Sequence, residues 1–322
     1  MRASLHQNIL ITHPINIRYF TGVQVSSGFL LCMPRSMQFF VDSRYREEAR
    51  DTAKKNVQVR GCDELEPILN RLKSCAFEAE HVSVARLHVW KKRFTKVQFR
   101  PSLGIAEEIR RCKKANEIHC LKKAEIITEQ ILQRIPVALR MLPTEQELAW
   151  KMRVSAEELG AERFSFDPIV AFGRNTSRPH HHPTDRRLKK GDLVQIDMGI
   201  VVSGYCSDRS MVYFTEQKTH DQQKAFMAVC EAHDAAVACA KRGVLNQELD
   251  RVARDILKTY GMEEAFTHAL GHGIGLEVHE GITISAHAPA KKLLKGEVIT
   301  IEPGVYFPGR FGMRVESMVY VQ

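Results

Sequence analysis

The chain has 322 residues, of which 26% are charged and 44% hydrophobic, and this composition excludes a disordered protein and allows about two domains of ordinary size. The net charge of +9 comes from lysines and arginines scattered among nearly as many acids, with no basic tail and no interleaved run of basic and aromatic residues. We therefore do not expect nucleic acid as the main ligand. The positive charge could instead help a substrate carboxylate to approach.

The eight cysteines are spread singly along the chain, which predicts free thiols in a reducing cytosol. No stretch has the length of a membrane span, and the apolar residues 9–11 are too few for the core of a signal peptide. We expect a cytoplasmic protein that binds neither membrane nor nucleic acid.

The first 112 residues predict a small α/β domain with a mixed sheet. Short apolar runs, typical of strands, lie at residues 28–33, 37–41, 57–59 and 82–87. Polar stretches, typical of helices, lie between them at residues 45–53 and 65–72. No catalytic pattern stands out in this region.

From Lys113 onward the periodicity of apolar residues predicts longer helices, so we place a domain boundary between residues 112 and 113. One helix covers residues 118–135 and is expected to end before Pro136. A second is expected to begin at Thr144, because Thr144 and Glu147 have the spacing of a capping box. A third covers residues 249–260 and is closed by Gly261.

A ten-residue pattern occurs twice in this larger region, at residues 188–197 and 293–302. Both copies have the same apolar rhythm, a glycine and a terminal acid, which predicts a turn and then a strand that delivers a carboxylate. A further acid follows each strand on the return strand, Asp208 in the first copy and Glu316 in the second. Because helical sequence precedes each copy, we expect two similar α/β halves with a site between them.

The acids of this repeat predict a metal centre. Asp197 and Glu302 end apolar strands and should be partly buried, and a buried carboxylate needs a compensating cation. Four converging carboxylates and one histidine are too many for a single tetrahedral zinc ion, and they suit two metal ions about 3.5–4 Å apart. Since this ligand set has one nitrogen and no sulfur, we expect two Mn²⁺ ions, with Co²⁺ or Zn²⁺ as alternatives. Asp192 and Glu297, at the polar starts of the strands, are not expected to take part.

Residues 267–280 set three histidines among three glycines. The glycines argue against a helix, and we expect them to let the backbone approach ions and substrate closely. The helical zinc-protease motif is absent. One imidazole is expected to bind metal, which leaves the others for proton transfer or oxyanion stabilisation. His180 lies in a histidine triplet between two prolines, which by itself could be only a polar surface loop.

Taken together, these motifs resemble the pita-bread metallopeptidases, and within them the branch of Xaa-Pro aminopeptidases and Xaa-Pro dipeptidases (prolidases). The motifs that carry the resemblance are Pro179-His-His, Asp197-Met-Gly, Ser207-Asp208, residues 268–280, Glu302-Pro-Gly and Arg314-Val-Glu316. Residues 16–22 and 42–45 resemble the creatinase-type N-terminal domain of this branch. The resemblance covers nearly the whole chain. It implies an α+β protein, with a pita-bread catalytic domain of two pseudo-symmetric α/β halves at residues 113–322 and a creatinase-type α/β domain at residues 1–112.

The resemblance also implies roles, position by position. Two divalent ions would be held by Asp197, Asp208, His272, Glu302 and Glu316. Asp208 and Glu316 would bridge the ions, whose shared hydroxide attacks the peptide carbonyl, and Glu302 would relay the proton. The family positions that bind substrate, stabilise the tetrahedral intermediate and move protons are matched by His180, His268 and His279. Arg314 would orient the metal-binding carboxylates.

The implied activity is that of a dinuclear-metal exopeptidase that hydrolyses the bond before proline, in Xaa-Pro dipeptides or at the N-terminus of Xaa-Pro peptides. A homodimer is expected, because relatives are commonly dimeric. Methionine aminopeptidases share the catalytic fold but generally lack a domain like residues 1–112. Non-catalytic pita-bread binding modules, and the metal-free creatine hydrolases, keep fewer metal ligands, whereas all five ligand positions are filled here.

Two departures from the family pattern stand out. Ser210-Met-Val stands where many relatives have Thr-Arg-Thr, so the hydroxyl is kept and the arginine is lost. Arg174 and Arg178 lie near His180, where relatives usually have smaller or less charged residues. We hypothesise that one of these arginines binds a substrate carboxylate and so favours dipeptides.

Overall fold

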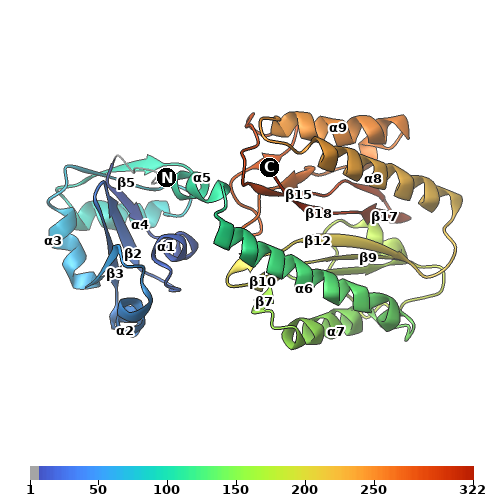
Figure 1. Ribbon diagram of the computed structural model, residues 1–322, viewed down its shortest axis with the longest axis horizontal. Helices are drawn as coiled ribbons and strands as arrows, with labels where there is room; N and C mark the ends of the chain where they lie inside the picture. Colours follow the sequence, from blue (N-terminus) through green and yellow to red (C-terminus); the bar gives the residue numbers. More distant parts are fainter. Residues whose placement is uncertain (1–6) are drawn as a thin grey trace. The chain divides into compact units, whose positions relative to one another are not determined.

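The computed structural model describes residues 7–322, and these fall into two compact units that divide between Arg110 and Arg111 (Figure 1). The predicted boundary between residues 112 and 113 lies close to this division. None of the helices in the described part of the chain is both long and apolar enough to cross a membrane.

The first unit is a six-stranded mixed sheet with helices on both faces. Its strands, in spatial order, are β4 (Val57–Gly61), β3 (Ser36–Val41), β2 (Phe29–Met33), β1 (Ile9–Ile11), β5 (Ser74–Glu78) and β6 (Gln98–Ser102). The strand β2 runs antiparallel to both of its neighbours, whereas the pairs β1/β5, β5/β6 and β3/β4 are parallel. The predicted mixed α/β architecture of this unit is confirmed.

Successive residues of the central strands face opposite sides of this sheet, as the pleat requires. Leu10 and Phe40 pack on one face with residues of α3 (Leu65–Leu69) and α4 (Val84–Arg93). Ile11 and Phe39 pack on the other face with residues of α1 (Pro14–Thr21) and α2 (Ser43–Thr52). The last helix of the unit is α5 (Ile105–Arg111), and a short 3₁₀ turn, η1 (Cys62–Glu64), precedes α3.

One predicted strand of the first unit is wrong. The apolar run at residues 82–87 leads into the helix α4, because the Ser83 hydroxyl accepts a hydrogen bond from the N–H of Arg86 at 3.2 Å and caps the first turn. The strands β1, β5 and β6 were not predicted. Each of them has only three to five residues, which is too few for a clear alternation of polar and apolar side chains.

The second unit consists of two halves, each covered by a pair of helices, and the strands lie between the two pairs (Figure 1). The first half contains α6 (Ala115–Leu139), α7 (Glu145–Glu158), β7 (Arg163–Phe164), β8 (Ile169–Phe172), η2 (Gly173–Ser177), β9 (Leu193–Met198), β10 (Ile200–Val202), β11 (Tyr205–Cys206) and β12 (Arg209–Phe214). The second half contains α8 (His220–Cys239), α9 (Asn246–Thr259), η3 (Glu263–Ala265), β13 (Gly271–His272), β14 (Thr283–Ile284), β15 (Val298–Ile301), β16 (Gly304–Phe307), β17 (Phe311–Arg314) and β18 (Ser317–Tyr320).

The two copies of the ten-residue pattern take equivalent places in these halves. β9 pairs antiparallel with β12, and β15 pairs antiparallel with β18. A small hairpin separates the partners in both halves, β10–β11 in the first and β16–β17 in the second. Asp208 and Glu316 each lie directly before the return strand, and not within it as predicted. The predicted arrangement of two similar α/β halves is confirmed.

The prediction that the first long helix ends before Pro136 is wrong, because α6 continues through this proline to Leu139. A proline within a helix has no N–H for the carbonyl four residues earlier, which here belongs to Leu132. The hydroxyl of Tyr213, on β12, donates a hydrogen bond to that carbonyl at 3.0 Å. A side chain from a neighbouring strand thus replaces the missing backbone donor.

The other two predicted helix ends are confirmed. Thr144 and Glu147 form a reciprocal capping box at the start of α7, with hydrogen bonds of 2.8 and 3.0 Å. α9 ends at Thr259, and Gly261 follows with a φ of 72°, a conformation that favours glycine. The long helix α8 was not predicted.

We predict that Tyr213→Phe lowers the free energy of unfolding by about 1 kcal/mol, because the Leu132 carbonyl loses its donor. In a Pro136→Ala background the same substitution should cost at most half as much, since the alanine N–H can then bond that carbonyl. Urea unfolding of the four proteins of this double-mutant cycle measures the coupling. Tyr320→Phe is the matched control, because its hydroxyl bonds the Glu125 side chain at 2.8 Å. Equal costs of Tyr213→Phe in both backgrounds would contradict this account of the helix.

Candidate metal centre

The second unit contains a cavity of about 770 Å³ whose walls come from both halves. β9 and the segment before β12 contribute Asp197 and Asp208. The second half contributes Glu302 and Glu316, which lie beside β15 and β18, and three of the six histidines that line the cavity. Every site residue predicted from the sequence lines this cavity, namely His180, Asp197, Asp208, His268, His272, His279, Glu302, Arg314 and Glu316.

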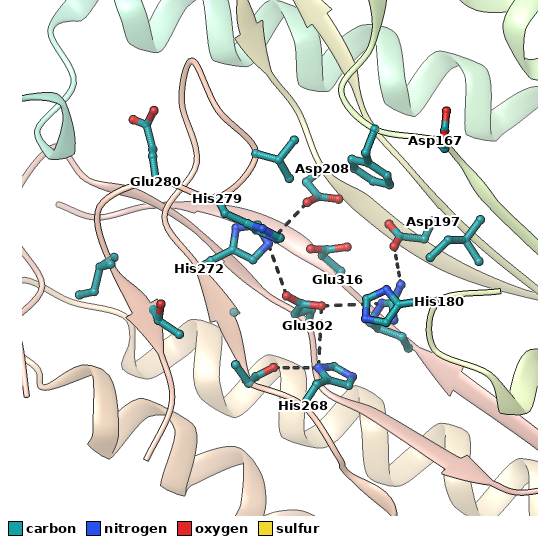
Figure 2. A pocket seen from close by; sticks show the side chains of 18 of the residues that line it. Asp167, His180, Asp197, Asp208, His268, His272, His279, Glu280, Glu302 and Glu316 are labelled. Atoms are coloured by element: carbon teal, nitrogen blue, oxygen red, sulfur yellow. Dashed lines mark hydrogen bonds and ion pairs between the residues drawn. The ribbon is translucent and has the colours of Figure 1, made fainter. Parts of the chain in front are cut away.

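The groups proposed as metal ligands converge in this cavity. Figure 2 shows the carboxylates of Asp208, Glu302 and Glu316 and the ring of His272 pointing toward one another. Nε2 of His272 lies 3.6 Å from Oδ2 of Asp208 and 3.5 Å from Oε1 of Glu302. Ligand atoms of Asp208, His272 and Glu316 all lie within 4.8 Å of one another. One ion could therefore contact groups from both halves.

The backbone orients the His272 ring for this role. Nδ1 of His272 lies 3.2 Å from the carbonyl oxygen of Gly273, so Nδ1 carries the proton and donates it. The lone pair of Nε2 then faces the carboxylates. Burial, and then the nearby His279, lowers the pKa of His272 to about 3, so the ring stays neutral as a metal ligand must. The His279 ring packs edge-on against it, with ring centroids 4.1 Å apart.

The acids of the cavity cannot all be ionised without a compensating cation. Burial, and then repulsion from Glu316 and Asp197, raises the pKa of the Asp208 carboxyl well above its usual range. Burial and repulsion from Glu302 and Asp197 raise the pKa of Glu316 in the same way. The pKa of Glu302 is raised by burial to about 8.

The cavity fits divalent ions in two respects. Oδ1 of Asp197 and Oδ1 of Asp208 are buried and have no hydrogen-bond partner within residues 7–322. Buried oxygens of this kind need a donor or a cation. The donor set is four carboxylates and one imidazole, which is the hard, oxygen-rich ligation that Mn²⁺ prefers.

Arg314, on β17, is the cation that the chain itself supplies to these acids. Its side chain is buried, and Nη2 contacts Oδ2 of Asp197 while Nε lies 3.8 Å from Oε2 of Glu302. Nε also donates to the hydroxyl of Ser210 at 2.9 Å, and the backbone N–H donates to Oε1 of Gln195 at 2.8 Å. The hydroxyl that Ser210 retains therefore orients the guanidinium, which in turn orients two of the carboxylates.

Tyr306, on β16, connects this arginine to His268. Nη1 of Arg314 donates to the Tyr306 hydroxyl at 2.8 Å, and that hydroxyl lies 3.1 Å from Nε2 of His268. Nδ1 of His268 lies 2.8 Å from the carbonyl oxygen of Ala269 and so carries the proton. Burial, and then the charge of Arg314, lowers the pKa of His268 to about 3, so the ring is neutral. Both nitrogens are engaged, and the ring is held 4.0 Å from Oε2 of Glu302.

The histidine triplet is a site segment and not merely a surface loop. His180 and His182 are exposed at the cavity, whereas His181 is buried with Nε2 2.8 Å from Oε2 of Glu145. The same carboxylate oxygen accepts the N–H and the hydroxyl of Thr184 at 2.9 and 2.6 Å. Glu145, at the start of α7, thus fixes the segment that carries His180.

The glycines of residues 267–280 allow neighbouring backbone segments to pack closely. A Cβ on Gly271 would lie 2.0 Å from the carbonyl oxygen of Thr300, and one on Gly273 would lie 2.1 Å from that of Glu280. These glycines let β13 pass close to β15 and to the following loop. The predicted absence of a helix here is confirmed, because His272 lies on a strand.

Several conspicuous charges near the repeat stay out of the cavity. Asp192 forms an ion pair with Arg186 at 2.8 Å, and Glu297 forms one with Arg111 at 2.5 Å. Both acids therefore stabilise the fold and do not contribute to the cavity, as predicted. Arg174 and Arg178 are exposed and do not line the cavity. Their binding of a substrate carboxylate stays a hypothesis.

Sequence reasoning missed the residues that hold the site in place, chiefly Tyr306, Gln195 and Glu145. A polar residue within an apolar strand is a usable signal, and Gln195 in Leu-Val-Gln-Ile is one. Tyr306 and Glu145 carry no such signal, because a tyrosine in a strand and an acid in the first turn of a helix are ordinary residues there.

The sequence and fold match known proteins over nearly their whole length. Residues 119–322 match the model of metallopeptidase family M24, and residues 1–112 match the creatinase/prolidase N-terminal domain. The chain belongs to metallopeptidase family M24. It is therefore a metal-dependent hydrolase, with a pita-bread catalytic domain preceded by a creatinase-type domain.

Individual relatives of this M24 protein align from end to end. It is 31% identical to the Xaa-Pro dipeptidase of Pyrococcus furiosus, over 97% of this chain and 90% of that protein. It is 32% identical to a putative Xaa-Pro aminopeptidase of Mycoplasma pneumoniae, over 98% of this chain and 89% of that one. Among solved structures, the prolidase from Pyrococcus furiosus superposes with a TM-score of 0.90 at 31% identity, covering 98% of this chain and 94% of that chain. The X-Pro aminopeptidase from Thermotoga maritima gives 0.89 at 30% identity, with the same coverage.

We predict that Glu302→Gln stabilises the metal-free protein at pH 8. An acid whose pKa rises from about 4.5 unfolded to about 8 folded binds more protons in the folded state, so stability falls as pH rises between these values. Glutamine does not ionise, so the variant does not lose stability in this pH range. At pH 8 its free energy of unfolding should exceed that of the wild type by at least about 1 kcal/mol, and at pH 4.5 the two values should differ little. Urea unfolding in a chelator at both pH values tests this. Parallel pH profiles for the two proteins would contradict it.

Proposed function

We propose that this M24 protein is a dinuclear-metal exopeptidase that hydrolyses the bond before proline, in Xaa-Pro dipeptides or at the N-terminus of Xaa-Pro peptides. The observation that supports it best is the convergence of four acids and one neutral imidazole in one cavity, with buried oxygens that need a cation. The proline preference rests on the full-length relatives whose names state it.

The ions would be held by Asp197, Asp208, His272, Glu302 and Glu316, with Asp208 and Glu316 between them. Mn²⁺ suits these ligands, with Co²⁺ and Zn²⁺ as alternatives. When bound, two such ions would supply the acidity that makes the attacking water a nucleophile near neutral pH and would polarise the scissile carbonyl.

Glu302 would take the proton of the attacking water and deliver it to the departing proline nitrogen. A general base must lie within reach of the proton that it takes, and Glu302 lines the cavity together with the other proposed ligands. Its Oε2 faces Nε of Arg314 and Nδ1 of His268, which hold the carboxylate in one orientation. Its Oε1 faces His272.

The remaining histidines would act on the substrate. Figure 2 shows His180 and His279 on either side of Glu316, where they can reach a peptide bound over the carboxylates. Burial, and then the nearby His180, lowers the pKa of His279, so it is a neutral donor to the oxygen of the tetrahedral intermediate. His268 would position Glu302. Arg314 would keep Asp197 and Glu302 in place.

Two alternative functions are less well supported. A methionine aminopeptidase would share the catalytic unit, but residues 1–112 match the N-terminal domain of creatinases and prolidases. A non-catalytic binding module would have no need for a complete set of metal-ligand residues. The homodimer and the cytoplasmic location stay predictions.

An assay of peptide hydrolysis tests the proposal. With Mn²⁺ present, an Xaa-Pro dipeptide or an Xaa-Pro-Xaa tripeptide should be cleaved before proline, and a Met-Ala peptide should not. A chelator should abolish this activity, and added Mn²⁺ should restore it. Glu302→Gln should lower kcat by about 10²–10⁴-fold, because the proton acceptor is lost. Cleavage of Met-Ala without cleavage of Xaa-Pro would establish the methionine aminopeptidase instead.

We further predict that Tyr306→Phe lowers kcat/KM by about 10–100-fold, the usual effect of removing a residue that orients a metal site. The substitution leaves Nη1 of Arg314 buried without its acceptor and removes the hydrogen-bond partner of Nε2 of His268. Tyr320→Phe is the control, because that hydroxyl bonds Glu125 and does not line the cavity. Equal activities of the two variants would remove Tyr306 from the mechanism.

A further inference from the structure

A second group of metal-ligating side chains lies in the first unit, where no catalytic pattern was recognised. His13 follows β1 and precedes α1, His81 follows β5, and Glu107 lies on α5. Because β1 and β5 are adjacent and parallel, their carboxyl ends bring His13 and His81 to the same edge of the sheet. Ligand sites of open α/β sheets form at this edge.

The three side chains are within the reach of one ion. The rings of His13 and His81 are stacked, with centroids 3.8 Å apart and planes inclined by 9°, so one ring has to turn before the in-plane lone pairs of both can meet at one ion. Nε2 of His81 lies 3.1 Å from Oε1 of Glu107, and ligand atoms of all three residues lie within 4.8 Å of one another. Two ligand atoms at tetrahedral positions on a zinc ion are about 3.3 Å apart, so the His81–Glu107 pair already has this spacing.

Buried polar residues form hydrogen bonds that hold the Glu107 carboxylate in place. Nδ2 of Asn16 donates to Oε1 of Glu107 at 2.7 Å and to Oε1 of Glu78 at 2.7 Å. Nη1 of Arg110 donates to Oδ1 of Asn16 at 2.6 Å. The carboxylate is thus held in one orientation, as the supporting residues of metal sites achieve.

We propose that His13, His81 and Glu107 form a zinc site in the first unit, separate from the catalytic metal centre. Two imidazoles and one carboxylate are a ligand set that Zn²⁺ takes in proteins, with water in the fourth position. All three residues are partly exposed, so ions and water can enter. This set contains two nitrogens, whereas the catalytic centre has one, so zinc is favoured here over Mn²⁺.

An ion at this site would cross-link parts of the chain that are distant in sequence. Its ligands come from residues 13, 81 and 107, so an ion can bind all of them only when the first unit is folded. Zinc would therefore stabilise this unit and leave the chemistry of the other one untouched. The alternative is a plain hydrogen bond between His81 and Glu107 that binds no ion.

The test measures zinc on the full chain. In a protein carrying Asp208→Asn and Glu316→Gln, which disable the catalytic centre, equilibrium dialysis should give one zinc per chain. Adding His13→Phe and His81→Gln should reduce this to none, because both ligand nitrogens are lost. Phenylalanine still supplies a flat ring at position 13, and glutamine still supplies a hydrogen-bonding group at position 81. His88→Ala, an exposed histidine on α4, should keep the zinc. Equal binding with and without the His13 and His81 substitutions would overturn the proposal.

A second measurement does not depend on how those histidine variants fold. With the catalytic centre disabled and His13 and His81 intact, zinc at about a hundredfold above its Kd should raise the Tm of the first unit by roughly 5 °C or more. Mn²⁺ at the same concentration should raise it less. No shift with zinc would overturn the proposal. In the otherwise wild-type chain, His13→Phe with His81→Gln should leave peptide hydrolysis with Mn²⁺ unchanged.

Discussion

The second unit is organised around the cost of burying four carboxylates in one cavity. Only one buried arginine, Arg314, contacts these acids among the described residues, and it reaches Asp197 and Glu302. The pKa values of Asp208, Glu302 and Glu316 are all raised, so without added cations part of this group must stay protonated. The same acids that weaken the metal-free fold would, in the proposed metal centre, create the affinity for divalent ions. Stability and metal binding would then be two consequences of one arrangement of charge.

The pseudo-symmetry of the unit explains how the acids meet. Each half places one acid at the end of a central strand and another just before its return strand, with a small hairpin between them. Because the backbone of the two halves is similar, the same strand and hairpin arrangement brings two acids from each half to the cavity between them. The groups that differ between the halves then decide the chemistry. His272 comes from the second half alone, and the His180 segment, fixed by Glu145, comes from the first.

A chain of neutral hydrogen-bond partners gives the charged groups their orientation. Gln195 and Ser210 hold Arg314 from the first half, and Tyr306 joins it to His268. Gln195, Ser210 and Tyr306 carry no charge at neutral pH. They nevertheless support the proposed ligands, because a carboxylate that can rotate does not keep a fixed metal geometry. Ser210 takes part through its hydroxyl.

The sequence by itself determined the four acids of the repeat, the two-half plan and the capped ends of α7 and α9, and its resemblance to a known family indicated the histidines of the site. The acids, the plan and the capped ends depend on local periodicity, capping and a repeated motif, which neighbouring residues specify. Only the tertiary structure decided that α6 passes through Pro136, that Tyr306 and Glu145 support the site, and that His13, His81 and Glu107 meet. Each of these depends on a contact between residues far apart in the chain, and no local pattern records which side chain a distant strand or helix will present.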